Sequence, residues 1–195
     1  MKIFQAFFVG SIVMLILECG CNHGNPDESF ASNTNPYFPL KMGNTWIYSS
    51  RWEPSDSLTI KVIGYSWQKG RWYAEVDEQF TRSGITLLRW HSFWTYGDSG
   101  RVLKYDDLNY VGKWNKSVYY DTQAKGESTW DLNSTNAMYV KMMGRFDSLS
   151  SHGTTYRDCL AYFVDGVGGE RVERLARGVG MIGMGPFELV YHDLK

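Results

Sequence analysis

The nine residues Leu88–Tyr96, with the sequence LRWHSFWTY, carry large, mainly apolar side chains at four of the five alternate positions 88, 90, 92, 94 and 96, the exception being Ser92. Trp90 and Trp94 share one parity, whereas Arg89 and Thr95 fall on the other. Successive side chains of a β-strand point to opposite faces of a sheet, so this alternation is typical of a half-buried strand. We therefore expect a strand here, with both tryptophans on its inner face.

The same two-residue period recurs along the chain from Tyr37 onward, and glycine-containing turn sequences separate the runs. Connections this short favour antiparallel neighbours. The segment 106–117 has room for one helical turn. The predicted fold class is all-β, an antiparallel meander forming a twisted, half-closed or closed β-barrel-like sheet. The predicted strands cover 45–52, 57–66, 71–80, 86–96, 101–105, 117–120, 137–147, 156–164, 170–176 and 186–192.

Composition narrows the class of protein further. The 195 residues fit one domain, and 43% hydrophobic content argues against a wholly disordered chain. Tyr, Phe and Trp make up 16% of the residues, which favours strands and a core rich in rings. The formal net charge of −1 argues against nucleic acid as a partner, because such binders usually carry a concentrated basic excess.

The N terminus has the pattern of a secretory signal peptide. Lys2 precedes Ile3–Leu17, a run without charge. As a helix this run covers roughly 22 Å, which is short of the ~30 Å hydrocarbon core of a bilayer. We interpret residues 1–20 as a signal peptide. A buried N-terminal helix and an uncleaved anchor are the alternatives.

Residues 17–21, LECGC, resemble a bacterial lipobox, in which a small residue precedes an acylated cysteine. Gly20 precedes Cys21 as that pattern requires, whereas Glu18 stands where it has an aliphatic residue. Cys21 is thus the predicted lipid attachment site, and the membrane is a partner through this lipid. The predicted location is the bacterial cell envelope, with the outer membrane favoured. Cleavage without acylation, giving a soluble secreted or periplasmic chain, is the alternative.

Residues 21–36 are polar apart from Phe30 and Ala31, so we expect a flexible tether ahead of a single β-rich domain over 37–195. If Cys21 carries lipid, Cys159 has no partner within the mature chain and is expected as a small buried residue. A Cys21–Cys159 disulfide is the alternative in the absence of lipid.

Four further segments follow one another along the chain: FPLKMGNTWIY at Phe38–Tyr48, Tyr120-Asp121 with GESTW at 126–130, Cys159-Leu160, and GVGMI at 178–182. Together they resemble a family of bacterial envelope proteins, mostly lipoproteins, for which no catalytic residues are assigned. The resemblance covers roughly 37–191 and implies a β-rich envelope protein. Where the family has a lysine shortly after its last motif, this chain has Gly183-Met184 instead.

Sequence motifs for catalysis or cofactors are weak. Residues 178–183, GVGMIG, match the dinucleotide fingerprint G-x-G-x-x-G, but Pro186 opposes the helix that must follow it. A glycine-rich turn or bulge before the last strand explains this segment better. Ser151, His152 and Asp158 are close in sequence, yet neighbouring side chains of a strand face opposite ways. We expect no catalytic residues and no cofactor.

No metal site is expected either. The four histidines are scattered, and Asp106-Asp107 lacks the alternating oxygen ligands of a calcium loop. The loop 165–170, DGVGGE, could offer oxygen ligands but is explained as well by a solvated hairpin.

Together these features predict an exported, lipid-anchored envelope domain with a non-catalytic binding or scaffold role and an unidentified small-molecule or protein partner. The alternative is a glycan- or apolar-ligand-binding protein that uses an aromatic-lined face, and a hydrolase is a remote one. Trp46 and Tyr48 share a face of the first expected strand. We expect Trp46 to cap the core and Tyr48 to find a polar partner at the rim.

Overall fold

The computed structural model describes residues 24–30, 35–105, 117–133, 138–166 and 169–195, and these form one sheet with a single helical turn before it. None of the helices within these residues has the length and hydropathy needed to cross a bilayer. The elements are α1 (Pro26–Ser29), β1 (Thr45–Ser50), β2 (Asp56–Gln68), β3 (Arg71–Arg82), β4 (Ile85–Tyr96), the 3₁₀ turn η1 (Asp98–Gly100), β5 (Arg101–Tyr105), β6 (Ser117–Asp121), β7 (Thr129–Asn133), β8 (Met138–Ser151), β9 (Thr154–Gly166), β10 (Gly169–Ala176), β11 (Gly180–Met184) and β12 (Phe187–Asp193).

The twelve strands form a nearly closed antiparallel barrel, which confirms the predicted fold class. The sheet order is β6-β5-β4-β3-β2-β1-β12-β11-β10-β9-β8-β7, so the first and last strands of the chain pair at its centre. The edge strands β6 and β7 lie side by side, and no backbone ladder joins their described residues. There the indole of Trp130 donates a hydrogen bond of 2.7 Å to the carbonyl oxygen of Val118 and bridges the seam.

The expected strands correspond to ten of the twelve observed ones, with ends that differ by a few residues. The predictions missed β7 and β11. The GMIGM sequence of β11 contains two glycines and no alternation, so its pairing with β10 and β12 is set by the sheet around it. The helical turn considered within 106–117 falls almost wholly outside the described residues.

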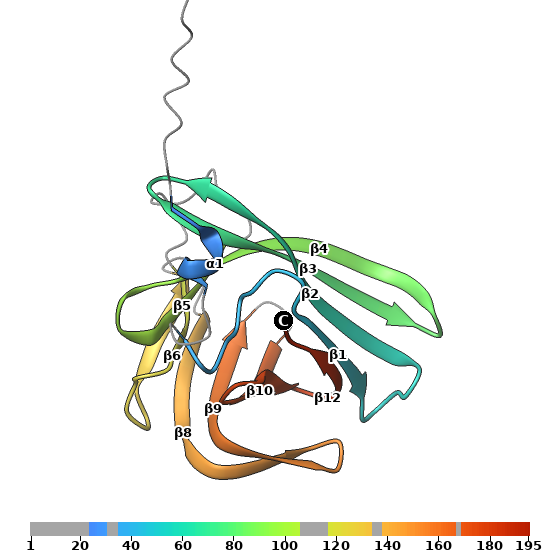
Figure 1. Cartoon of the computed structure of the whole chain (residues 1–195). Helices are drawn as coiled ribbons and strands as arrows, with labels where there is room; N and C mark the ends of the chain where they lie inside the picture. The colour runs from blue at the N-terminus through green and yellow to red at the C-terminus, as the bar shows by residue number, and fades with distance from the viewer. Residues whose placement is uncertain (1–23, 31–34, 106–116, 134–137, 167–168) are drawn as a thin grey trace, which may run out of the picture.

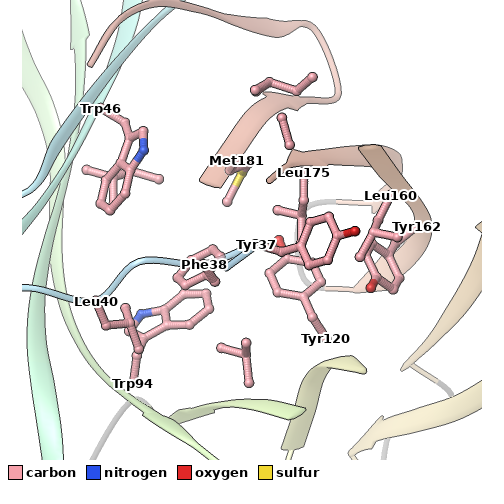
Figure 2. Packing of buried hydrophobic residues seen from close by; sticks show 14 of the residues in the cluster. Tyr37, Phe38, Leu40, Trp46, Trp94, Tyr120, Leu160, Tyr162, Leu175 and Met181 are labelled. Carbon is pink, nitrogen blue, oxygen red and sulfur yellow. The ribbon is translucent and has the colours of Figure 1, made fainter. Parts of the chain in front are cut away.

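The interior of the barrel is filled by the chain's own N-terminal segment, residues 35–44. Figure 1 shows this segment in blue, crossing the space enclosed by the strands. Phe38 stacks on Trp94 with ring centroids 4.8 Å apart, and Leu40 has no exposed surface. Figure 2 shows these rings gathered around the segment, and Tyr120 contacts both Phe38 and Trp94, with ring centroids 5.6 and 6.5 Å away. We call residues 35–44 the core segment.

Residues ahead of the core segment also pack against the barrel, although the composition of 21–36 predicted a flexible tether. Phe30 is only 2% exposed and belongs to the main core cluster, and Asn35 is fully buried. The tether predicted over 21–36 is therefore wrong for these residues, because one phenylalanine in a polar stretch finds an aromatic socket on the barrel. Residues 1–23 and 31–34 lie outside the described part of the chain.

Candidate functional site

Trp90 and Trp94 of β4 share a face, as predicted, but differ in how much of each side chain is exposed to solvent. Trp94 is 3% exposed and packs between the ring of Phe38 and the ammonium of Lys104. Trp90 is 38% exposed and lies on the part of β4 that continues past the end of β5. The two indoles therefore do not form a continuous aromatic face for a ligand.

The tryptophan and tyrosine of β1 also share a face, and both are buried. The Trp46 indole donates to the carbonyl oxygen of Val179 at 2.7 Å, and the Tyr48 hydroxyl donates to that of Met181 at 2.9 Å. The prediction that Tyr48 lies at the rim is wrong, since Tyr48 has no exposed surface. Its hydroxyl is satisfied inside the barrel because the backbone of β11 offers an acceptor there.

An ion pair lies buried on β10. Glu173 is fully buried, and its carboxylate accepts a 2.6 Å hydrogen bond from Arg171 and another from the Tyr120 hydroxyl. The Tyr119 hydroxyl accepts from Arg171 at 2.7 Å and donates to Glu173 at 3.3 Å. Burial, together with the negative charge of Glu173, raises the pKa of both tyrosines, so both remain protonated donors.

A second ion pair joins β3 to β5. Glu78 is 5% exposed, and its Oε1 accepts hydrogen bonds from Lys104 Nζ at 2.7 Å and from the Ser92 hydroxyl at 2.8 Å. Burial acts to raise the pKa of Glu78. Lys104 and the hydrogen bonds from Ser92 and Trp90 outweigh that effect, so the net direction is downward. Ser92 in turn accepts from the Trp94 indole at 2.8 Å, which connects the pair to the aromatic core.

Neither buried carboxylate has the arrangement of a general acid or base. General acid–base catalysis needs a group that reaches substrate and titrates near the working pH. The carboxylates of Glu78 and Glu173 instead accept hydrogen bonds from other side chains of the barrel. Sequence reasoning overlooked both residues, although Glu78 shares the parity of Val76, and Glu173 that of Leu175, on strands that were predicted.

The structure separates the residues considered for nucleophilic catalysis. Ser151 is buried and bonded to the backbone of Ile182 and Leu189, whereas the side chain of His152 is exposed. Asp158 accepts from Tyr37 and pairs with Arg177.

The glycine-rich segment 178–183 forms a turn and then strand β11, so a strand follows it where a dinucleotide motif needs a helix. Gly178 and Gly180 both have positive φ, at 74° and 98°. A side chain at Gly180 would also approach the Trp46 indole and Pro39 to within 3.3 Å.

The structure tests only some of the remaining predicted residues. Cys21 and Asp106-Asp107 lie outside the described residues, as do residues 167 and 168 of the loop 165–170. The described residues on either side of that loop belong to β9 and β10, which pair antiparallel. Cys159 is a free, fully buried thiol, as expected, and burial is the main cause that raises its pKa. Within the described ranges no three His, Cys, Asp or Glu side chains gather as a metal site would require.

An open groove of about 510 Å³ lies where α1 meets the β2–β3 and β4–β5 turns. The rings of Trp67 and Trp72 meet edge to face in it, with centroids 5.3 Å apart. The Thr95 hydroxyl of β4 donates a 2.8 Å hydrogen bond to the backbone carbonyl of Trp72 and so links β4 to β3 at this groove. We call this the tryptophan groove, and its side chains include Phe30, Trp67, Arg71, Trp72, Tyr96 and Asp98.

Comparison with known proteins identifies no family. No family model matches the sequence, and no curated protein matches it. A solved Bacteroides fragilis structure, described as a "putative exported protein with YmcC-like fold", aligns at 10% identity and a TM-score of 0.49, covering 82% of this chain and 100% of that one. A Parabacteroides distasonis "putative lipoprotein" aligns at 10% identity and a TM-score of 0.42, covering 82% and 99%. Similarity at this level carries no functional argument.

Proposed function

We propose that the chain is an exported cell-envelope protein, anchored through lipid on Cys21, whose β-domain has a non-catalytic binding or scaffold role. The anchor rests on the N-terminal pattern: Lys2, the uncharged run Ile3–Leu17, and Gly20 before Cys21. A single acyl chain binds a membrane only marginally, so stable attachment requires more than one chain on this cysteine. Attachment to the outer membrane is part of the proposal.

One observation carries the binding or scaffold role: the core segment occupies the interior of the barrel. Phe38 and Leu40 lie where a carrier would hold an apolar ligand, and both are at most 5% exposed. Every buried side-chain nitrogen and oxygen in the described residues already has a hydrogen-bond partner. Contacts with other molecules therefore belong to the outer surface of the domain.

Mass spectrometry of the chain purified from bacterial membranes tests the anchor. We expect a mature N terminus at Cys21 that carries thioether-linked diacylglycerol. Cys21→Ser should lose the lipid and move the protein to the soluble fraction. Cys159→Ser is the matched control and should keep the lipid, because its thiol is buried in the domain. A mature terminus elsewhere, without lipid, would overturn the anchored form.

The tryptophan groove supports a second candidate function, the binding of a glycan or of an apolar ligand on the surface. Aromatic rings beside charged and hydroxyl groups suit such ligands, and Trp67, Trp72, Arg71 and Asp98 all line this groove. Tryptophan fluorescence titrated with soluble envelope glycans and fatty acids tests this function. A saturable change that Trp72→Ala removes would support it, and a flat response to both ligand classes would exclude it.

A further inference from the structure

Phe30, which follows α1, is docked between Tyr65 of β2 and Tyr96 of β4. Its ring stacks on Tyr65 at 5.1 Å with an interplanar angle of 7°, and meets the edge of Tyr96 at 5.5 Å. At 2% exposure Phe30 is as buried as the residues of the barrel core. We call the two tyrosines that enclose it the anchor socket.

Hydrogen bonds join the two tyrosines of the anchor socket to α1 and to the core segment. The Tyr65 hydroxyl donates to Asp27 of α1 at 3.1 Å and accepts from the backbone N–H of Met42 at 2.7 Å. The Tyr96 hydroxyl donates to the carbonyl oxygen of Phe38 at 2.6 Å. Each tyrosine is therefore bonded to the core segment, and Tyr65 is bonded to α1 as well. The docked turn belongs to the barrel and is not a free tail.

The chain between the docked turn and the predicted lipid is short. The side chain of Asn25 caps α1 by accepting from the N–H of Asp27 at 3.0 Å, so the docked region begins at Asn25. Four Cα–Cα steps separate Asn25 from Cys21. Even fully extended they span at most about 14 Å. If Cys21 carries lipid, the start of α1 lies within about that distance of the bilayer surface.

The docked turn lies at one end of the barrel. Figure 1 shows α1 beside the turn between β2 and β3, while the turn between β3 and β4 lies at the opposite end of the same strands. The twelve residues of β3 separate these ends by about 40 Å. We call the end with the β2–β3 and β4–β5 turns the near end, and the end with the β1–β2 and β3–β4 turns the far end.

We propose that the anchor socket seats the near end of the barrel against the bilayer surface and directs the far end away from it. This inference rests on the proposed lipid anchor, and the membrane surface is the occupant it assigns to the near end. Trp67, Trp72 and Arg71 lie at this end beside α1, and indole and guanidinium groups are suited to the headgroup layer.

The same orientation assigns a role to the apolar residues of the far end. Trp52 is 81% exposed, Ile85 66% and Leu88 58%. The turns that carry them are neighbours, since the N–H of Ser83 donates to the carbonyl oxygen of Ser55 at 2.9 Å. Held away from the lipid, these side chains face the aqueous space and are not available to the anchoring bilayer.

Energy transfer to labelled lipids tests the orientation in the full lipidated chain. A donor dye is placed through an azide-bearing residue at Gln68 (near end) or at Ile85 (far end), both exposed, and the protein is reconstituted in vesicles containing acceptor lipids. We expect transfer from position 68 to exceed transfer from position 85 at least threefold. Equal transfer from the two positions would overturn the proposal.

Two variants show whether the socket sets this orientation. Phe30→Ala should bring the two transfer efficiencies together, whereas Phe146→Ala, which removes a 40% exposed ring from β8, should leave their ratio unchanged. A ten-residue Gly/Ser insertion between Gly24 and Asn25 should also reduce the ratio of the two transfer efficiencies. Because the insertion leaves the socket intact, it tests the proposal even if Phe30→Ala unfolds the domain. An unchanged ratio after the insertion would overturn the role of the short link.

Failure of the lipid anchor and failure of the orientation give different results. If mass spectrometry finds no lipid on Cys21, the proposed function fails, and a maleimide phospholipid coupled to Cys21 of the chain from residue 21 onward still tests the orientation. If the lipid is present and the two positions transfer equally, the orientation fails and the proposed function stands.

Discussion

The two halves of β4 have the same alternation and opposite environments. Around Trp94 the strand is paired on both sides, and its inner face is covered by the core segment. Around Leu88 the strand pairs with β3, and no described residue pairs with its other edge. Leu88 is 58% exposed, whereas Trp94 is 3% exposed. The period of a strand therefore fixes which side chains share a face, and elements from elsewhere decide whether that face is covered.

The largest difference between the halves should appear on truncating each indole. Trp94→Ala removes a ring packed against Phe38 and should lower the free energy of unfolding by about 3–5 kcal/mol. Trp90→Ala should cost about 2 kcal/mol, because its ring is already partly solvated and the main loss is its hydrogen bond to Glu78. Urea unfolding followed by far-UV circular dichroism measures both. Similar losses in the two variants would contradict the contrast.

The ion pair of Arg171 and Glu173 on β10 can be compared with the more exposed pair of Arg89 on β4 and Asp77 on β3. Glu173→Gln leaves the partly buried Arg171, whose side chain is 20% exposed, without its counter-charge and should destabilise the protein by about 3 kcal/mol. The matched control is Asp77→Asn, which breaks a 2.8 Å pair with a largely exposed Arg89 and should cost less than about 1 kcal/mol. Thermal unfolding at neutral pH distinguishes them, and equal costs would show that the barrel interior does not isolate Glu173 from water.

Acid should weaken the hydrogen bonds that Glu78 of β3 accepts from Ser92 and Trp90, which lie between the two halves of β4. The folded protein holds the pKa of Glu78 below its ordinary value of 4.5, so the stabilisation is complete above that pH and is lost as the pH falls further. Unfolding free energies measured from pH 7 down to pH 3 should decline less steeply in Glu78→Gln than in the wild type. Asp56 and Asp158, whose pKa values are also lowered, should keep part of the slope in both proteins. Identical slopes would mean that folding does not change the pKa of Glu78.

The smallest expected effect concerns the seam opposite the centre of the sheet. Trp130→Phe keeps the ring and removes the indole N–H that bonds to Val118, so it should cost about 1 kcal/mol. Hydrogen exchange should accelerate in β6 and β7 and stay unchanged in β1 and β12, which are joined by a backbone ladder. Unchanged exchange in β6 and β7 would indicate that the seam is held by other contacts.

Much of the barrel could be predicted from the sequence, because alternation is a local signal. The predictions missed β11, whose glycines and methionines show no period of two. They also missed β7, although Trp130 and Leu132 alternate with polar residues in its sequence TWDLN. The candidate sites were less predictable. The anchor socket joins Phe30 to tyrosines on β2 and β4, and the core segment fills a space that exists only after β1 pairs with β12. Contacts between residues so far apart in sequence leave no local pattern.

The most direct test of the central claim, that the chain fills its own barrel, is calorimetric titration with a fatty acid of the wild type and of Phe38→Ala. The account predicts no saturable binding inside the wild-type barrel. It also predicts weak one-to-one binding in Phe38→Ala, which opens a cavity next to Trp94, provided that circular dichroism shows the variant to be folded. Tight one-to-one binding by the wild type that persists in Trp72→Ala, and so does not depend on the tryptophan groove, would contradict the account and identify the domain as a carrier.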